Sequence, residues 1–402
     1  MTQPESRTPR RILMYSHDTF GLGHLRRCRA IAHAIVDRYK SATVLILTGS
    51  PIIGSFSFKA RVDFVRIPGV IKLHNGDYTS LSLLQDLSNT LALRESIIRH
   101  TAEVFDPELF IVDKEPLGLK GEIEPTLEML TAKGVPAVLG LRDVLDTPDL
   151  LVPEWEQKNA IAAIERYYSR IWVYGDKSMG NPLDTVPGLE RIESKMLYTG
   201  YLRRSLPSTY TSLNLEQVKR PYILVTPGGG GDGIEMVDRV LKAYESGAEM
   251  PLNLLIVMGP FMPSETQEAF QHRAAQLDQV GIITFDNCME ALLQDASGVI
   301  AMGGYNTFCE ILSFDKQSVL LPRKVPRQEQ WLRAKKAEAL GLACCLDPDS
   351  PDLEQELQSA LSELHLKQAP SGKMPPGFMS GLEKICFDLQ ELMDVEDEVV
   401  CG

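Results

Sequence analysis

The chain of 402 residues alternates short, apolar, β-branched runs with longer amphipathic stretches, and this alternation limits what it can fold into. The pattern is typical of βα units, in which each strand of a parallel sheet is followed by a helix that covers it. The strands predicted in the first half are 12–16, 43–48, 62–66, 109–113, 135–140 and 171–174. Six strands are enough for one doubly wound sheet.

The alternation stops at the polar, turn-rich residues 205–221 and then starts again. Strands are predicted after it at 222–226, 253–258, 281–284, 298–301 and 317–321. A proline- and glycine-containing linker at 366–377 precedes an apolar-periodic segment, which predicts a last helix. The expected architecture is α/β, with Rossmann-like, doubly wound domains at 1–207 and 215–366 and a C-terminal helix within 376–394.

Charge and composition exclude several classes of protein. The formal net charge of −13 argues against nucleic acid as the main partner, because a phosphate backbone needs a basic surface. Amides at helix N-termini can still bind a small phosphorylated molecule. The seven cysteines show no metal-ligand spacing, and no signal-peptide core or membrane-length apolar run is visible. We expect a cytoplasmic protein that needs no metal and no cofactor.

The segment HDTFGLGH, residues 17–24, joins the first predicted strand to a helix. Ligands of open α/β sheets bind beyond the carboxyl ends of the strands, and Gly21 and Gly23 permit close backbone approach. A helix N-terminus disfavours imidazolium, so His24 is a candidate neutral base. A tight turn with His24 as a helix cap is the alternative. Arg26 replaces the third glycine of a dinucleotide fingerprint, which disfavours NAD.

A run of four glycines lies in TPGGGGDG, residues 226–233, after the first strand of the second domain. Such a run is costly in conformational entropy, so close backbone approach to a ligand explains it better than an ordinary loop does. Phosphate is the natural candidate, with Gly229, Gly230 and Gly231 as binding residues. No G-K-[ST] follows, so nucleotide hydrolysis of the P-loop kind is not supported.

The stretch from Gly303 to Gln330 combines a helix start, a strand and a second helix start. Glu310 can accept bonds from both hydroxyls of a ribose, and Glu329 and Gln330 can reach the hydroxyls of a sugar. Taken singly, Glu310 and Gln330 are ordinary surface residues, but their joint spacing predicts a nucleotide-sugar site. The residues expected to hold its pyrophosphate are Gly303, Gly304, Asn306 and Thr307.

The motif G-G-x-x-T-x-x-E, followed by a strand, a proline and [DE]-Q-x-x-x-A, resembles the C-terminal domain of family 28 glycosyltransferases. The resemblance implies a GT-B fold, with two domains facing a cleft and the last helix packing on the first domain. It implies that Thr307 and neighbouring amides hold phosphate, Glu310 the ribose, and Glu329 with Gln330 the donor sugar. The nucleotide base is expected at Phe285 and Asp286, largely through backbone.

Several functions follow from this resemblance. The first is an inverting, metal-independent hexosyl transfer from a nucleotide-diphosphate sugar, with a UDP-sugar favoured, in cell-envelope or exopolysaccharide biosynthesis. In this reaction His24 deprotonates the acceptor hydroxyl. The acceptor stays open and is a sugar or a lipid-linked molecule. Any contact with a membrane is expected to be weak and peripheral. The segment GLGHLRRC also resembles a nucleotide-sugar hydrolase of pseudaminic acid synthesis. Two more functions stay open, a nucleotide-sugar 2-epimerase and a non-catalytic nucleotide-sugar binding protein.

Other acidic residues carry weaker predictions. Asp113 and Asp143 follow predicted strands of the first domain and are reserve candidates for the base. Asp146 is expected to be a solvated or capping carboxylate. The pair Asp347 and Asp349 resembles a metal-binding D-x-D, but it lies in a proline-containing loop and is predicted to be a turn.

Overall fold

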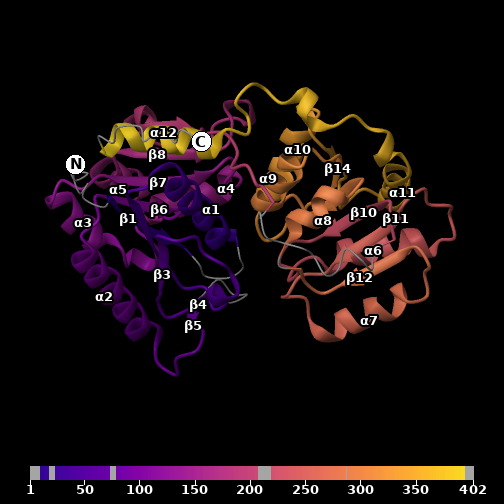
Figure 1. Ribbon diagram of the computed structural model, residues 1–402, viewed down its shortest axis with the longest axis horizontal. Coiled ribbons are helices and arrows are strands. Elements are labelled where there is room, and N and C mark those ends of the chain that lie inside the picture. The colour runs from indigo at the N-terminus through magenta and orange to yellow at the C-terminus, as the bar shows by residue number, and fades with distance from the viewer. Residues whose placement is uncertain (1–9, 18–22, 73–77, 207–218, 287, 394–402) are drawn as a thin grey trace, which may run out of the picture. The chain divides into compact units, whose positions relative to one another are not determined.

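The computed structural model describes residues 10–17, 23–72, 78–206, 219–286 and 288–393. Contacts group the chain into two compact units. Unit 1 comprises residues 1–202 and 380–402, and unit 2 comprises residues 203–379. Each unit has a parallel sheet at its centre (Figure 1).

In the described part of unit 1, the sheet has seven parallel strands in the order β3-β2-β1-β6-β7-β8-β9. Helices cover both of its faces, which is why its strands read as continuous apolar runs. Six of the strands match predicted ones, whereas β9 has only three half-buried residues and was missed. The strands are β1 Arg10–Ser16, β2 Ala42–Thr48, β3 Val62–Arg66, β6 Leu109–Asp113, β7 Ala137–Arg142, β8 Arg170–Tyr174 and β9 Met196–Tyr198.

Among the described residues, the helices that connect these strands are α1 Gly23–Arg38, α2 Leu87–Phe105, α3 Glu124–Ala132, α4 Pro148–Gln157 and α5 Ala160–Tyr167. In α1 the buried residues Leu25, Cys28 and Ala32 recur every three to four positions, so one face of the helix packs on the sheet. An antiparallel hairpin, β4 Val70–Lys72 and β5 Tyr78–Ser80, precedes α2.

The last helix, α12 Gly381–Met393, belongs to unit 1, as the resemblance implied. Figure 1 shows this yellow helix among the elements of unit 1, and it contacts α1. Its buried face includes Ile385 and Leu389. Trp172 Nε1 of β8 donates a hydrogen bond of 2.6 Å to Asp388, so a polar contact also ties the helix to the sheet.

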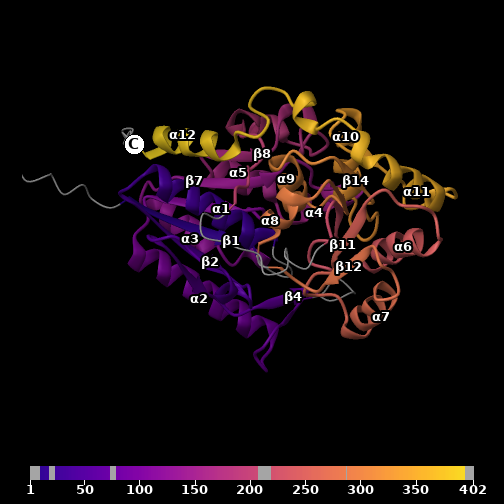
Figure 2. The ribbon, with the colours of Figure 1, turned by 45° about the vertical axis from the view of Figure 1, so that its right-hand side comes forward.

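In unit 2, the described residues form a sheet of six parallel strands in the order β12-β11-β10-β13-β14-β15. The strands are β10 Tyr222–Thr226, β11 Asn253–Val257, β12 Val280–Ile283, β13 Gly298–Ala301, β14 Ser318–Leu320 and β15 Cys344–Cys345. Around it lie α6 Ile234–Glu245, α7 Ser264–Ala274, α8 Met289–Asp295, α9 Tyr305–Ser313, α10 Glu329–Ala339 and α11 Leu353–Glu363 (Figure 2). This is the doubly wound order that was predicted.

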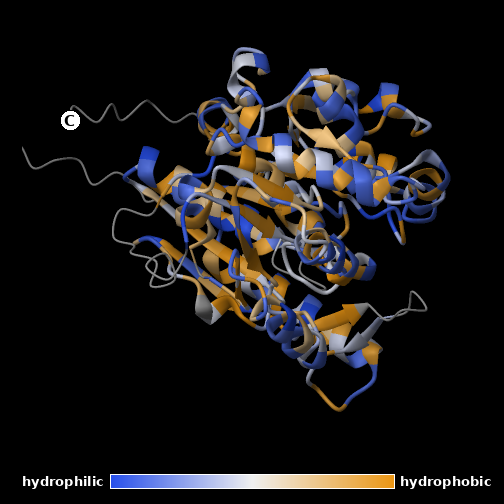
Figure 3. Cartoon of the chain, turned by 90° about the vertical axis from the view of Figure 1, so that its right-hand side faces the viewer, coloured by the Kyte–Doolittle hydropathy of each residue, from blue (hydrophilic) through white to orange (hydrophobic). Residues whose placement is uncertain are grey.

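Strand order fixes where a ligand can bind in each unit. The chain winds outward from β1 to β3 and then returns to β6 on the other side of β1, and it repeats this from β10 to β13. Figure 3 shows that the strands are predominantly hydrophobic, so polar groups for a ligand must come from the segments that follow the strands. Ligands of open sheets bind beyond the carboxyl ends at this reversal point. The segments there are those that begin after β1, β6, β10 and β13.

Candidate functional site

His24 and Asp113 meet at the reversal point of unit 1. His24 is the second residue of α1, Asp113 is the last residue of β6, and β1 pairs directly with β6. His24 Nδ1 lies 2.5 Å from Asp113 Oδ2. Because a carboxylate only accepts hydrogen bonds, Nδ1 carries the proton and the lone pair of the neutral ring lies on Nε2. This is the tautomer that a general base requires.

Arg27 completes a buried triad with these two residues. Its Nε and Nη2 donate to the two oxygens of Asp113 over 2.7 Å each, and Nη2 lies 3.0 Å from His24 Nδ1. Sequence reasoning did not single out Arg27, and it treated Asp113 as a reserve base rather than as a partner of His24. Arg27 could have been recognised from its position three residues after His24, which places both side chains on the same face of α1.

Burial keeps the imidazole of His24 neutral. Burial lowers the pKa of His24, and Arg27 and Lys114 lower it further, whereas Asp113 raises it. Burial raises the pKa of Asp113, but Arg27 and His24 outweigh this effect and hold it well below its usual range. At neutral pH the triad is therefore a neutral imidazole beside a carboxylate that a guanidinium neutralises.

A second buried histidine lies next to His24. The ring of His17 meets that of His24 edge-on, with centroids 5.8 Å apart. Tyr15 Oη lies 3.5 Å from His17 Nδ1 and donates to Glu122 over 2.6 Å. Burial lowers the pKa of His17 well below its ordinary value, so this ring is also neutral. His17 therefore adds no positive charge next to His24.

Two other candidate carboxylates of unit 1, Asp143 and Asp146, have structural partners. Asp143 is buried and accepts a hydrogen bond of 2.6 Å from Tyr201, which argues against it as a base. Asp146 accepts from the amide of Thr147, the N-cap residue of α4, so it makes a local contact before the helix rather than a cap. Gly23 is the first residue of α1, whereas Gly21 lies outside the described residues.

In unit 2, close packing explains much of the glycine run. Gly228 and Gly230 have φ of 80° and 90°, which favours glycine. A Cβ on Gly230 would lie 2.3 Å from the carbonyl oxygen of Met258, and one on Gly229 would lie 3.2 Å from the ring of Phe261. The close approach inferred from the run is thus partly an approach to the loop after β11, rather than to a ligand alone.

The start of α9 adjoins this loop and is open. A Cβ on Gly228 would lie 3.7 Å from Thr307 Oγ1, so the glycine run and α9 are neighbours. Gly304 is the N-cap of α9 and has no side chain to cover the first amides, and a Cβ there would meet nothing within 4 Å. The first amides of a helix are a ready site for a phosphate. The side chain of Asn306 accepts a hydrogen bond from Arg204 over 3.1 Å.

The residues predicted for ribose and sugar lie in the next two elements. Glu310 is buried in α9, and Glu329 and Gln330 are the buried first residues of α10. The fully buried Arg333 donates from Nη1 to the carbonyl of Gly303 over 3.0 Å and so ties α10 to the turn before α9. Sequence reasoning missed Arg333, although its place one turn after Glu329 was visible.

Phe285 and Asp286, expected near the base, follow β12. Phe285 is 44% exposed, which leaves an aromatic residue accessible at this edge of the sheet. Asp286 is buried and accepts from the amide of Cys288 over 2.8 Å, so its carboxylate shapes the local turn. The amide of Gly259 donates to the carbonyl of Thr284, which joins this segment to the loop that packs on the glycine run.

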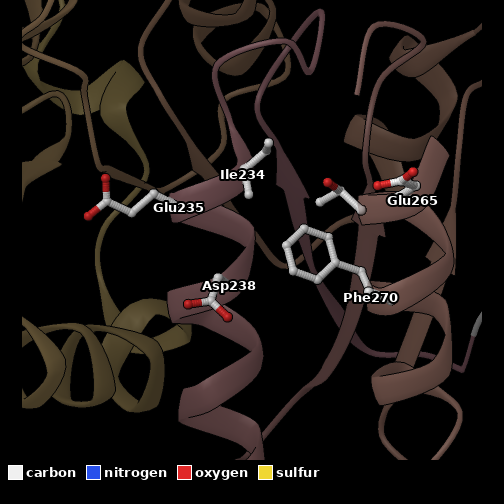
Figure 4. A pocket seen from close by; sticks show the side chains of 7 residues that line it. Ile234, Glu235, Asp238, Glu265 and Phe270 are labelled. Atoms are coloured by element: carbon white, nitrogen blue, oxygen red, sulfur yellow. The ribbon is translucent and has the colours of Figure 1, made fainter. Parts of the chain in front are cut away.

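A groove between α6 and α7 is a poor donor site (Figure 4). It has a volume of about 570 Å³ and is lined by the side chains of Ile234, Glu235, Asp238, Glu265 and Phe270, among others. Its three carboxylates would repel a diphosphate.

Two further observations concern metals and membranes. Lys324 pairs with both Asp347 and Asp349, and the amide of Asp349 donates to Asp347, so this pair forms the predicted turn. Within the described residues, no group of three or more His, Cys, Asp or Glu side chains is placed to hold a metal ion. None of the described helices combines the length and the apolar character needed to cross a membrane.

Part of the chain is similar to a known protein family. Residues 222–380 match the family model described as the glycosyltransferase family 28 C-terminal domain. The match covers most of unit 2. No curated protein sequence matches the chain significantly.

Solved structures show that the whole chain has the GT-B fold. MurG of Acinetobacter baumannii aligns with a TM-score of 0.59 at 15% identity, over 94% of this chain and 99% of that one. UGT2 of Phytolacca americana, solved with UDP-2-fluoro-glucose and pterostilbene, aligns with a TM-score of 0.62 at 15% identity, over 96% and 94%. CalG4, the calicheamicin glycosyltransferase, aligns with a TM-score of 0.61 at 14% identity, over 98% and 99%.

Proposed function

We propose that the protein is a glycosyltransferase that moves a hexose-type sugar from a nucleotide-diphosphate donor to an acceptor hydroxyl, with inversion and without a metal. The observation that carries this is the pair of His24 and Asp113 at the reversal point of unit 1. It occurs in a chain whose residues 222–380 match the family 28 glycosyltransferase C-terminal domain. We favour a UDP-sugar as the donor, because structural relatives were solved with UDP-2-fluoro-glucose or UDP.

In this mechanism His24 acts as general base. Its Nε2 accepts the proton of the acceptor hydroxyl as the oxygen attacks the anomeric carbon of the donor, and the bond from that carbon to the diphosphate breaks. Asp113 stabilises the imidazolium that forms. The amides at the start of α9 and in the glycine run stabilise the charge on the leaving diphosphate. A single displacement of this kind inverts the anomeric configuration.

The test is a donor screen followed by substitution. The wild-type chain is incubated with UDP-, GDP- and dTDP-sugars and an acceptor mixture, and release of the nucleoside diphosphate is measured. We expect His24→Ala to lower transfer by about 10²- to 10⁴-fold, the usual contribution of a general base. Glu310→Ala should raise the KM for the donor, because it removes the ribose contact.

The matched control is His100→Ala, which removes an exposed histidine from α2. It should leave transfer unchanged. Full activity in both His24→Ala and Glu310→Ala would overturn the site assignment.

A nucleotide-sugar hydrolase is the second candidate. Arg27 lies in the segment GLGHLRRC, which resembles such a hydrolase, and it is bonded to Asp113 in the same triad. Incubation of the donor without any acceptor separates the two functions. Rapid release of free sugar supports hydrolysis, and a stable donor supports transfer.

A further inference from the structure

Arg323, which follows β14, connects three parts of unit 2. Its Nε lies 2.6 Å from Asp232 in the glycine-rich loop. Its Nη2 donates to Glu329 Oε1 over 3.0 Å. Its backbone amide donates to Gln330 Oε1 over 3.2 Å. One residue thus contacts the loop after β10 and both polar residues at the start of α10.

These contacts fix the hydrogen-bonding character of Glu329 and Gln330. Because Gln330 Oε1 accepts from Arg323, the Nε2 group of this side chain is the part that can donate to another molecule. Glu329 Oε1 accepts a hydrogen bond from Arg323. Glu329 Oε2 is buried without a hydrogen-bond partner among the described residues. The Glu329 residue is only 7% exposed. A buried carboxylate oxygen without a partner is costly, so it points to a ligand that donates a hydrogen bond there.

We propose that Arg323 is a positioning residue for the donor sugar, which presents Glu329 as acceptor and Gln330 as donor to two hydroxyls of that sugar. This inference rests on the proposed function, because it concerns the sugar of the same nucleotide-sugar donor. The guanidinium is already occupied by two carboxylates, Asp232 and Glu329, which leaves it with little net charge for a diphosphate. Arg323 therefore selects the sugar and contributes little to binding of the nucleoside diphosphate.

The experiment compares binding of the nucleotide with binding of the nucleotide sugar. Isothermal titration of the full chain uses UDP, UDP-glucose, UDP-galactose and UDP-N-acetylglucosamine. In Arg323→Met, affinity for UDP should stay within about 3-fold of wild type, while affinity for the preferred UDP-sugar should fall about 10- to 100-fold, the range of a lost charge-assisted contact. Preference among the three sugars should disappear. Arg323→Lys should recover part of it, since an ammonium can still contact Glu329.

Two further variants guard against a general loss of structure. Asp232→Asn changes a half-exposed residue, so it should fold, and it should weaken sugar binding in the same direction by releasing one side of Arg323. Lys324→Met removes the neighbouring positive charge, which pairs with Asp347 and Asp349 instead, and should leave sugar preference unchanged.

Each remaining outcome has a defined meaning. If Arg323→Met weakens UDP as much as the UDP-sugar, Arg323 binds phosphate and the proposal is overturned. If neither Arg323 nor Asp232 variants alter sugar preference, it is overturned as well. If wild type binds neither these four probes nor GDP- or dTDP-sugars, the proposed function falls and this role falls with it.

Discussion

At the scale of single residues, the triad differs from a simple histidine–carboxylate pair. A carboxylate alone raises the basicity of a neighbouring imidazole, whereas here Arg27 neutralises Asp113 and lies next to His24. The arrangement keeps His24 neutral at a lower pH. His24 was predicted from its loop and helix position. The pairing of Arg27 with Asp113 was not, because it joins residues 86 positions apart and depends on which strands become neighbours.

Arg27 should therefore set the pH dependence of turnover. In Arg27→Gln the uncompensated Asp113 raises the pKa of His24, and since the base acts only when neutral, the acid limb of the rate profile should move to higher pH. Donor turnover measured from about pH 5 to about pH 9 reports this limb. Arg27→Lys keeps the charge and should shift it less. An acid limb that stays in place, or moves to lower pH, would falsify this account of the triad.

At the scale of elements, the glycine-rich loops show how one composition serves two purposes. The run at 226–233 suggested a phosphate site, yet Gly230 packs against the carbonyl of Met258. Gly304 has an ordinary φ of −58° and open space where a side chain would be. Both positions are glycine in the sequence. Only the backbone conformation and the neighbouring atoms show that one glycine is needed for packing and the other leaves room for a ligand.

Two alanine substitutions distinguish these purposes. Gly304→Ala should leave the free energy of unfolding within about 1 kcal/mol of wild type, because helix N-cap substitutions cost on this order. It should still weaken UDP binding, since the new methyl group enters the space where the diphosphate would reach α9. Gly230→Ala should instead lower stability by about 1–3 kcal/mol through backbone strain and the clash with Met258. Denaturant unfolding and UDP titration of both variants provide the measurement.

The two variants are controls for each other. Unchanged UDP affinity in Gly304→Ala would mean that the diphosphate does not bind at the start of α9. A Gly230→Ala chain as stable as wild type would contradict the packing explanation.

At the scale of the whole molecule, unit 1 is discontinuous, since α12 returns to it after the chain has formed unit 2. The two sheets were predictable because each βα unit has a local apolar pattern, and the last helix was predictable from its own periodicity. Its attachment to unit 1 came only from family resemblance. The edge strand β9 and the hairpin before α2 were not predicted, because three-residue strands carry too little pattern.

Because α12 packs on unit 1, substitutions in this helix should lower the stability of unit 1 without affecting unit 2. Asp388 accepts from Trp172 and pairs with Arg170, whereas Glu391 is exposed on the next turn of the same helix and contacts Arg170 only at 3.4 Å. Asp388→Ala leaves the buried Trp172 N–H without a partner, which should cost about 1–3 kcal/mol. Glu391→Ala should cost less than about 1 kcal/mol, as for exposed ion pairs.

Unfolding of both variants can be followed by tryptophan fluorescence, with UDP titration alongside. The loss in Asp388→Ala should be confined to unit 1, since UDP is expected to bind unit 2 and its affinity should not change. Equal losses of stability in the two variants would show that the buried contact with Trp172 does not anchor α12. A loss of UDP affinity in Asp388→Ala would instead show that the nucleotide site depends on this helix, although its residues lie outside unit 2.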